Sequence, residues 1–216
     1  MKLLLGYGSC GIASGAKDVL EGLNSVLEGT VHKVEKVGCN GLCFAEPIVD
    51  VVTDSGESVL YGRLDKNSAI ALAQAVADGV LPEENRLTED ELNFLTGQKR
   101  IVLSGCGKID PESIDSYIAN GGYSALKTAL EIGAESVIEQ IKLSGLRGRG
   151  GAGFPTYIKW QSARSSQGDE KYIVCNADEG DPGAFMDRAV LEGDPHRVLE
   201  GMMIAGVAVG AHTGII

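Results

Sequence analysis

The feature that most constrains this chain is a glycine-rich run, Gly145–Gly153, in which five of nine residues are glycine. So many glycines remove side-chain bulk and permit positive φ, so that backbone N–H groups can converge on an anion or lie flat against an aromatic ring. Arg147 and Arg149 add charge that persists at any pH. Pro155 is well placed to begin a helix, whose N-terminus also favours phosphate. The run predicts an anion-binding loop; the alternative is a flexible loop with two solvated arginines.

The run contains the motif G-x-G-x-x-G, formed by Gly148, Gly150 and Gly153. In a dinucleotide-binding fold that motif follows a strand directly. Here the preceding residues, Ser136–Leu143, have helical periodicity, which argues against the ordinary dinucleotide fingerprint. A Walker A loop is excluded as well, because no Lys-Ser/Thr pair closes the run.

A second polar segment, Asn176–Gly183, begins where the apolar strand expected over Lys171–Cys175 ends. Ligands of open α/β sheets bind at the carboxyl ends of strands. An amide and two or three carboxylates at such a place can hydrogen-bond ring nitrogens, carbonyls and sugar hydroxyls. Taken alone, an acidic turn with Pro-Gly punctuation explains the segment equally well.

Charge and composition exclude several partners. The net charge of −11 disfavours nucleic acid, which needs clustered Lys and Arg, and disfavours an anionic membrane surface. No run of about 18 apolar residues predicts a membrane span, and the start of the chain lacks the pattern of a signal peptide. The odd number of cysteines, 5, argues against a disulfide framework. We therefore expect a cytoplasmic protein without direct membrane insertion.

The order of elements predicts an α/β fold. Strands are expected at Lys2–Leu5 and Thr30–Val37 around a helix that ends at Gly29, followed by a hairpin over 48–61 and a helix over Lys66–Ala77. This makes a first domain of residues 1–79, and the polar, acidic residues 80–109 read as a linker with a short helix at Glu89–Leu95 and a short strand at Ile101–Ser104.

The third region, residues 110–216, is expected to be mainly helical around the two polar segments. Helices are predicted from Asp110, over Ser124–Glu131, over Ala134–Leu143, after Pro155 and from Asp194. Thr213–Ile216 has the composition of a beginning strand, which suggests that the domain is incomplete.

At the two polar segments the chain resembles a known family. Ser144–Thr156 with Lys159 and Trp160, and then Asn176–Gly180 with Gly183, Asp187 and Arg188, closely resemble the flavoprotein subunit of NADH:quinone oxidoreductase (complex I). The segment Asp181–His196 looks most like the relatives in NAD-linked and electron-bifurcating hydrogenases and formate dehydrogenases; related subunits also occur in benzoyl-CoA reductase complexes. The resemblance is strong over residues 100–216 and looser over 1–80.

The resemblance implies a site for FMN and NAD(H). It implies an enzyme subunit that exchanges hydride between NAD(H) and FMN and passes single electrons to iron–sulfur clusters of partner subunits. It places Phe154 near the nicotinamide and Asp181 against NADH. The implied FMN contacts are Gly148, Arg149, Gly150, Gly151, Lys159, Asn176, Asp178 and Glu179. It names no catalytic acid or base.

The resemblance also implies a thioredoxin-like ferredoxin domain over residues 1–79. Its 2Fe–2S cluster would take four thiolates. Cys39 and Cys43 fit the second ligand pair and Cys10 fits one member of the first, but Leu5 stands where the other is expected. A 4Fe–4S cluster would belong to a later part of such a protein, beyond Ile216.

Two further hypotheses remain open. The chain could be a non-catalytic assembly or docking module whose ferredoxin domain has lost its cluster. It could also be an anion-binding module unrelated to redox chemistry. A thiol–disulfide enzyme is disfavoured, because the C-x-x-C motif is missing.

Overall fold

The protein is a mixed α/β chain, seen in a computed structural model that describes residues 1–168 and 170–216. It divides into two compact units. The first comprises Met1–Ser116 together with Arg188–Pro195, and the second comprises Tyr117–Asp187 together with His196–Ile216.

The first unit is built on a four-stranded sheet with the strand order β2-β1-β3-β4. Strand β1 is parallel to β2 and antiparallel to β3, and β3 is antiparallel to β4. Strands β1 and β2 are joined through a helix, and β3 and β4 are joined through a tight turn, as the sequence predicted. The strands are β1 (Lys2–Gly6), β2 (Lys33–Val37), β3 (Val49–Val52) and β4 (Ser58–Tyr61).

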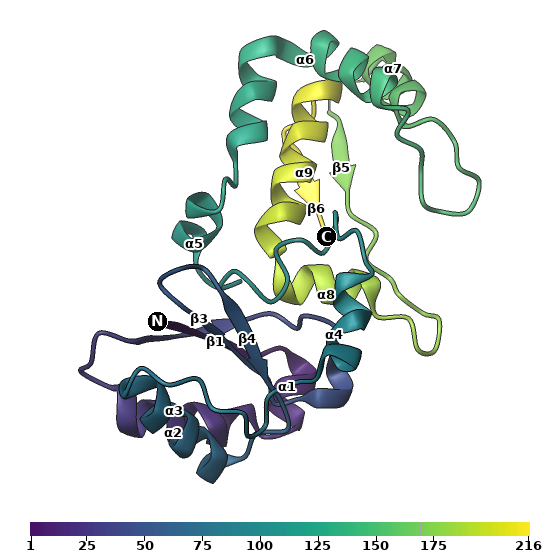
Figure 1. Cartoon of the computed structure of the whole chain (residues 1–216). Helices are drawn as coiled ribbons and strands as arrows, with labels where there is room; N and C mark the ends of the chain where they lie inside the picture. The colour runs from purple at the N-terminus through teal and green to yellow at the C-terminus, as the bar shows by residue number, and fades with distance from the viewer. Residues whose placement is uncertain (169) are drawn as a thin grey trace. The chain divides into compact units, whose positions relative to one another are not determined.

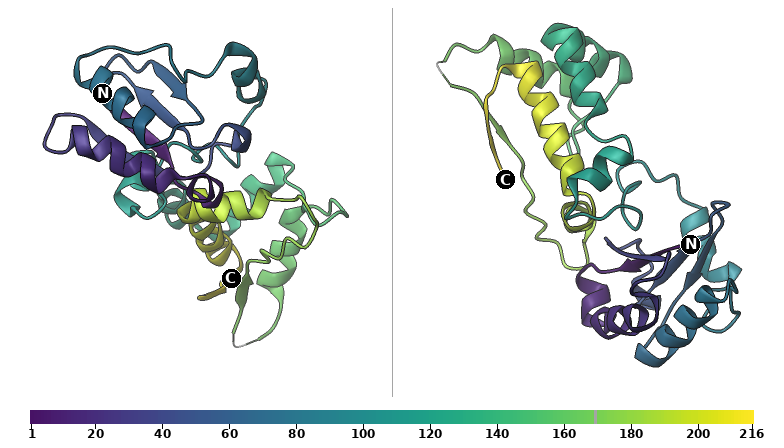
Figure 2. Two further views of the ribbon diagram at one scale, coloured as in Figure 1. Left: turned by 90° about the horizontal axis from the view of Figure 1, so that it is seen from below. Right: turned by 90° about the vertical axis from the view of Figure 1, so that its left-hand side faces the viewer.

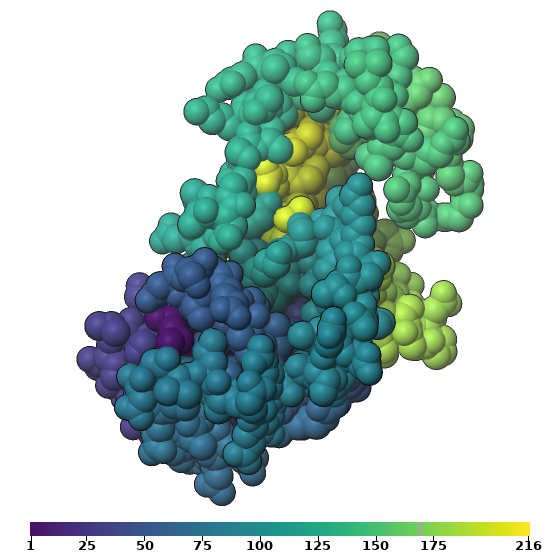
Figure 3. Space-filling model, viewed as in Figure 1, coloured from purple at the N-terminus to yellow at the C-terminus, as the bar shows by residue number. Residues whose placement is uncertain are grey.

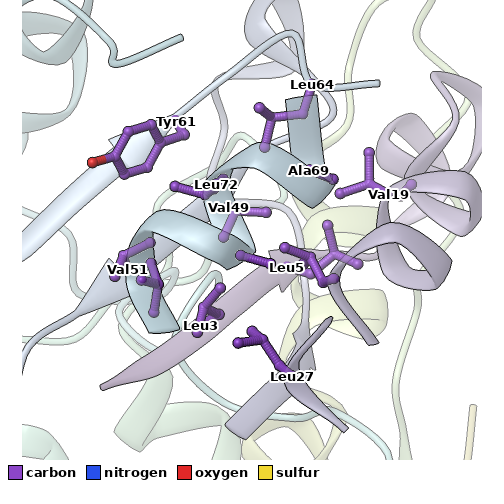
Figure 4. Packing of buried hydrophobic residues seen from close by; sticks show 14 of the residues in the cluster. Leu3, Leu5, Val19, Leu27, Val49, Val51, Tyr61, Leu64, Ala69 and Leu72 are labelled. Atoms are coloured by element: carbon purple, nitrogen blue, oxygen red, sulfur yellow. The ribbon is translucent and has the colours of Figure 1, made fainter. Parts of the chain in front are cut away.

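Two helices, α2 (Ala16–Leu27) and α3 (Lys66–Ala77), lie side by side on one face of this sheet (Figures 1 and 2). They approach closely at Gly22, where an added Cβ would lie 2.7 Å from the Lys66 carbonyl oxygen. Alternate residues of β1, Leu3 and Leu5, point into the core that the helices cover (Figure 4). Both leucines are fully buried, so this face holds the unit together through burial of apolar area.

Short elements complete the first unit. They are α1 (Ser9–Ala13), the 3₁₀ helix η1 (Cys43–Ala45), α4 (Glu89–Thr96) and most of α8 (Met186–Gly193). Helices α1 and α8 were not predicted from the sequence. The strand expected at Ile101–Ser104 is wrong. Those residues form turns in which backbone groups pair locally, as in the bond from Ser104 N to the Ile101 carbonyl at 3.4 Å.

Close contacts between glycines and their neighbours fix α8 within the first unit. A Cβ at Gly38 would lie 2.3 Å from Gly193 Cα, and one at Gly193 would lie 2.9 Å from the Cys106 Sγ. The buried Cys106 thiol donates to the Ala189 carbonyl at 3.5 Å. The end of α8 therefore packs against the residue that precedes Cys39.

The second unit consists of long helices beside a pair of parallel strands. Helix α6 (Ser124–Ser144) is interrupted at Gly133, which has φ +78°, so the two helices predicted there are confirmed. Buried residues of α6 and α9 (Pro195–Val209) form the core, with Trp160 of α7 (Thr156–Ser165) packed against it. The space-filling view shows residues of α6 and α7 curving over those of α9 (Figure 3).

The remaining elements of this region are α5 (Ile114–Ala119), β5 (Tyr172–Val174) and β6 (Thr213–Ile215). Helix α5 begins later than Asp110, because the Asp110 carboxylate instead caps a turn by accepting from Glu112 N at 3.0 Å. Strands β5 and β6 pair in parallel. In the described part of the chain no helix is long and apolar enough to cross a membrane.

Candidate functional site

The glycine-rich run is an ordered loop that closes on itself between α6 and α7. Gly148 N donates to the Phe154 carbonyl at 2.9 Å, and Thr156 N donates to the Leu146 carbonyl at 3.0 Å. The loop reverses through Gly151 and Gly153, whose φ values of +96° and +59° are costly for any other residue. Glycine is therefore required by the backbone path itself.

The tip of this loop is open. Added Cβ atoms at Gly150 and Gly151 would meet no atom within 4 Å, so their backbones are accessible to a ligand. The Arg147 guanidinium donates to the Gly153 carbonyl at 3.0 Å, and the Arg149 guanidinium donates to the Arg147 carbonyl at 2.5 Å. These bonds hold both arginines along the loop.

Helix α7 brings Lys159 to the same loop. Its ammonium lies 5.9 Å from the centre of the Phe154 ring and would be 3.4 Å from a Cβ at Gly148. Phe154 itself is 45% exposed, so one ring surface is open to a partner. Lys159 sits in the first turn of α7, beside an N-terminus at which Pro155 provides no side-chain cap. Three of the residues expected at the site are thus brought together.

The charge balance around the loop is unusual for so acidic a chain. The net charge is −11, yet within the described residues Arg147, Arg149 and Lys159 form no ion pair with a carboxylate. Cations left unpaired around converging N–H groups favour an anionic ligand. The loop can therefore accept a phosphate without first breaking a salt bridge.

The second polar segment follows β5 as an exposed loop. Asp178 N donates to Asn176 Oδ1 at 3.0 Å, Ala184 N donates to the Asp181 carbonyl at 3.0 Å, and Asp187 N donates to Glu179 Oε1 at 3.0 Å. These bonds shape the segment locally and orient it after the strand. They do not join it to the glycine loop, so the expected convergence of the two segments stays a prediction.

A buried carboxylate that the sequence did not single out anchors the helix leading to the glycine loop. Glu200 of α9 accepts hydrogen bonds from the Tyr117 hydroxyl at 2.5 Å, Tyr123 N at 2.9 Å and Leu126 N at 3.0 Å. Burial by itself raises the pKa of Glu200, but these hydrogen bonds outweigh it and leave the pKa lowered. The carboxylate replaces the missing side-chain cap of α6.

The three cysteines singled out in the first unit lie together. Cys39 Sγ is 3.6 Å from Cys43 Sγ, and the Cys10 thiol interacts with that of Cys43. Gly41 N donates to Cys39 Sγ at 3.3 Å. For all three thiols, burial is the largest cause of a raised pKa. Within the described residues, no group of three or more His, Cys, Asp or Glu side chains is arranged to hold a metal ion.

A fourth ionisable group, Glu46, borders these thiols. It is 8% exposed, and its Oε2 accepts from Ile48 N at 3.0 Å. Burial raises the pKa of Glu46 to about 7, against the opposing effects of the Ile48 N–H and the Cys39 thiol. Glu46 was not identified from the sequence; the one feature that could have pointed to it is its position directly before Pro47 in the loop after Cys43.

Residues 141–216 match the sequence model of the Nuo51 FMN-binding domain. This stretch contains the glycine loop, Lys159 and the second polar segment. The resemblance predicted from the sequence is confirmed.

Individual relatives point the same way. The chain is 60% identical over 119 residues to the NADP-reducing hydrogenase subunit HndC of Solidesulfovibrio fructosivorans, covering 55% of this chain and 24% of that one. It is 47% identical over 117 residues to an NADH-quinone oxidoreductase subunit of Rhizobium meliloti, covering 54% and 28%. The chain thus spans about a quarter of the length of these relatives.

Among solved structures, the NAD⁺-reducing [NiFe]-hydrogenase in its air-oxidised state is similar with a TM-score of 0.41 and 23% identity. That alignment covers 99% of this chain and 36% of the other. It is too distant to bear on the site.

Proposed function

We propose that this chain is part of an oxidoreductase subunit that exchanges hydride between NAD(H) and FMN and passes single electrons to iron–sulfur clusters in a larger complex. The observation that carries the proposal is the glycine loop with its unpaired cations, inside the stretch that matches an FMN-binding domain. When bound, the flavin supplies the hydride and electron chemistry, and the protein positions and tunes it.

The loop residues would hold the phosphate end of the flavin. The accessible backbones of Gly150 and Gly151 would donate to its oxygens, Gly148 would shape the loop beside them, and Arg149 and Lys159 would supply the opposite charge. The half-exposed ring of Phe154 would stack beside the nicotinamide.

The second polar segment would complete the pocket. Asn176, Asp178 and Glu179 offer amide and carboxylate groups for ring and hydroxyl positions of FMN, and Asp181 would meet NAD(H). Convergence of this segment on the glycine loop is part of the proposal.

In the first unit we propose a thioredoxin-like ferredoxin domain over residues 1–79, with 80–109 as a linker and 110–216 as the beginning of the flavin domain. The strand order β2-β1-β3-β4, with two helices on one face, supports it. So does the meeting of Cys10, Cys39 and Cys43, which offers three thiolates to a 2Fe–2S cluster.

Partners follow from the same proposal. The electrons would leave through iron–sulfur subunits of a multisubunit complex, and we propose a cytoplasmic location for it. The relatives named above carry the names of subunits of hydrogenases and NADH-quinone oxidoreductases.

A second candidate is a docking module without a cluster. Leu5, at the place of one expected cluster ligand, is fully buried among apolar residues and cannot ligate iron. This observation concerns the first unit only, so it leaves the flavin proposal untouched.

Flavin retention tests the proposal. Lys159→Ala should lower flavin retention by the intact protein after gel filtration, because loss of one charge-assisted hydrogen bond of about 1.5 kcal/mol raises the Kd for FMN about tenfold. Lys142→Ala is the matched control, because this lysine of α6 is half exposed and paired with Glu139 at 3.0 Å. Equal retention in both variants would contradict the placement of the phosphate.

A further inference from the structure

Glu46 carries a buried oxygen that lacks a partner. Its Oε2 is held by Ile48 N at 3.0 Å, whereas Oε1 is buried and has no hydrogen-bond partner in the described part of the chain. Buried carboxylate oxygens are almost always paired, so an unpaired one needs an explanation, and a bound ion is one. The other oxygen ties the side chain to the backbone.

The carboxylate lies near the three thiols. It interacts with Cys39, and its charge is felt by both Cys10 and Cys43. Two glycines make the space for it, since a Cβ at Gly6 would lie 3.1 Å from Glu46 Oε2 and one at Gly11 would lie 3.3 Å from the same atom. Gly6 and Gly11 directly adjoin Leu5 and Cys10.

Glu46 lies near the position at which one of the four expected cluster ligands is missing. The first ligand pair would come from residue 5 and Cys10, and Leu5 instead points into the sheet core with no exposed surface. The carboxylate lies against the next residue, Gly6. The carboxylate of Glu46, which directly follows the 3₁₀ helix η1, is thus a candidate ligand next to the end of β1.

We infer that Glu46 Oε1 is the fourth protein ligand of an iron–sulfur cluster held by Cys10, Cys39 and Cys43. This inference rests on the cluster assignment within the proposed function and deepens it. A carboxylate carries the same charge as a thiolate, so the substitution keeps the net charge of the ligand set.

The donor set fits such a centre. Two thiolates about 2.3 Å from one tetrahedral metal are about 3.8 Å apart, a geometry known from zinc–thiolate sites. The Cys39 and Cys43 sulfurs are already separated by 3.6 Å. The side chains do not form a single-ion site, but a two-iron cluster spreads its four ligands over two metals.

The test is anaerobic reconstitution of the intact protein with ferrous iron and sulfide. We compare the wild type with Glu46→Gln, which keeps the size of the side chain but loses its charge. Glu57→Gln is the control, because Glu57 is exposed in the β3–β4 turn. The readouts are iron and sulfide per chain and the EPR spectrum of the reduced sample.

The expected result is that the wild type and control hold about two irons per chain more than Glu46→Gln, or that Glu46→Gln holds them with altered EPR g-values. Thermal unfolding of the apoproteins separates ligation from folding, since removal of a buried unpaired charge should leave the apoprotein at least as stable. Should the Gln variant misfold, Glu46→Asp serves as the second variant. It keeps the charge with a shorter reach, and we expect it to change the EPR spectrum.

Wild-type levels of iron with an unchanged EPR spectrum in either variant would overturn the inference, as would a wild type without the EPR signal of a 2Fe–2S cluster. Flavin content of the same samples keeps the two proposals apart. Flavin without the 2Fe–2S signal would refute the cluster ligand and leave the flavin function standing, whereas that signal without flavin would refute the flavin function alone.

Discussion

Glu200 offers the clearest quantitative prediction, because its carboxylate joins helices distant in sequence. It accepts from the Tyr117 hydroxyl, Tyr123 N and Leu126 N at 2.5, 2.9 and 3.0 Å, and it is 7% exposed. Hydrogen bonds to a charged group contribute about 1.5–3 kcal/mol each but are not additive. We expect Glu200→Ala to lower the free energy of unfolding by about 3–5 kcal/mol, and Glu200→Gln by about 2 kcal/mol.

The pH dependence of this loss has a definite sign. The folded-state pKa of Glu200 lies below its ordinary value of 4.5, so the unfolded chain takes up the proton first as pH falls. The stabilisation is present above about pH 4.5 and is lost as pH falls through the folded pKa. The difference in the free energy of unfolding between the wild type and Glu200→Gln should therefore become smaller at acidic pH.

The assay is urea unfolding followed by circular dichroism, with hydrogen exchange of the Tyr123 and Leu126 amides as a local readout. Glu139→Gln is the control, because that carboxylate is exposed and its ion pair with Lys142 should be worth less than about 1 kcal/mol. A Glu200→Gln variant as stable as this control would refute the idea that Glu200 caps α6.

Three further substitutions test the close packing at Gly11, a glycine of α9 and the cap at the start of α4. Gly11→Ala should destabilise by about 1–3 kcal/mol in thermal unfolding, because the new Cβ would lie 2.4 Å from the Gly6 carbonyl oxygen; in contrast, Gly201→Ala in α9 meets no atom within 4 Å and should stabilise by about 0.5–1 kcal/mol. If both changes had the same sign, the close approach of α1 to β1 would be in doubt. Thr88→Ala removes the capping box that Thr88 forms with Glu91 and should cost about 1 kcal/mol, seen as faster amide exchange in the first turn of α4; unchanged exchange would contradict the cap.

Much of the first unit could be predicted from local pattern. The short apolar run of β1 and the Asp54-Ser55-Gly56 turn predict strands of the sheet, and α3 lies where its periodicity placed it. Helix α8 was missed because its position depends on tertiary contacts of Gly193 with Gly38 and Cys106, which no local window contains.

The site was predictable only where a run of sequence carries it. The glycine loop, Arg149 and Lys159 lie within a few residues of one another, so their grouping is local. Glu46 and Glu200 were not predicted from the sequence, because their partners are distant along the chain. Glu200 contacts Tyr117, which is 83 residues away, and Glu46 lies near Cys10 and Gly6.

The central claim is that the glycine loop binds flavin phosphate for exchange of hydride with NAD(H). The most direct measurement is the absorption spectrum of the intact protein, purified with its flavin, before and after anaerobic addition of NADH. We expect a bound FMN whose oxidised-flavin absorption bleaches on addition of NADH, and a Lys159→Ala variant that binds FMN about tenfold more weakly. A protein that retains no flavin, or a Lys159→Ala variant that retains as much flavin as the wild type, would contradict this claim.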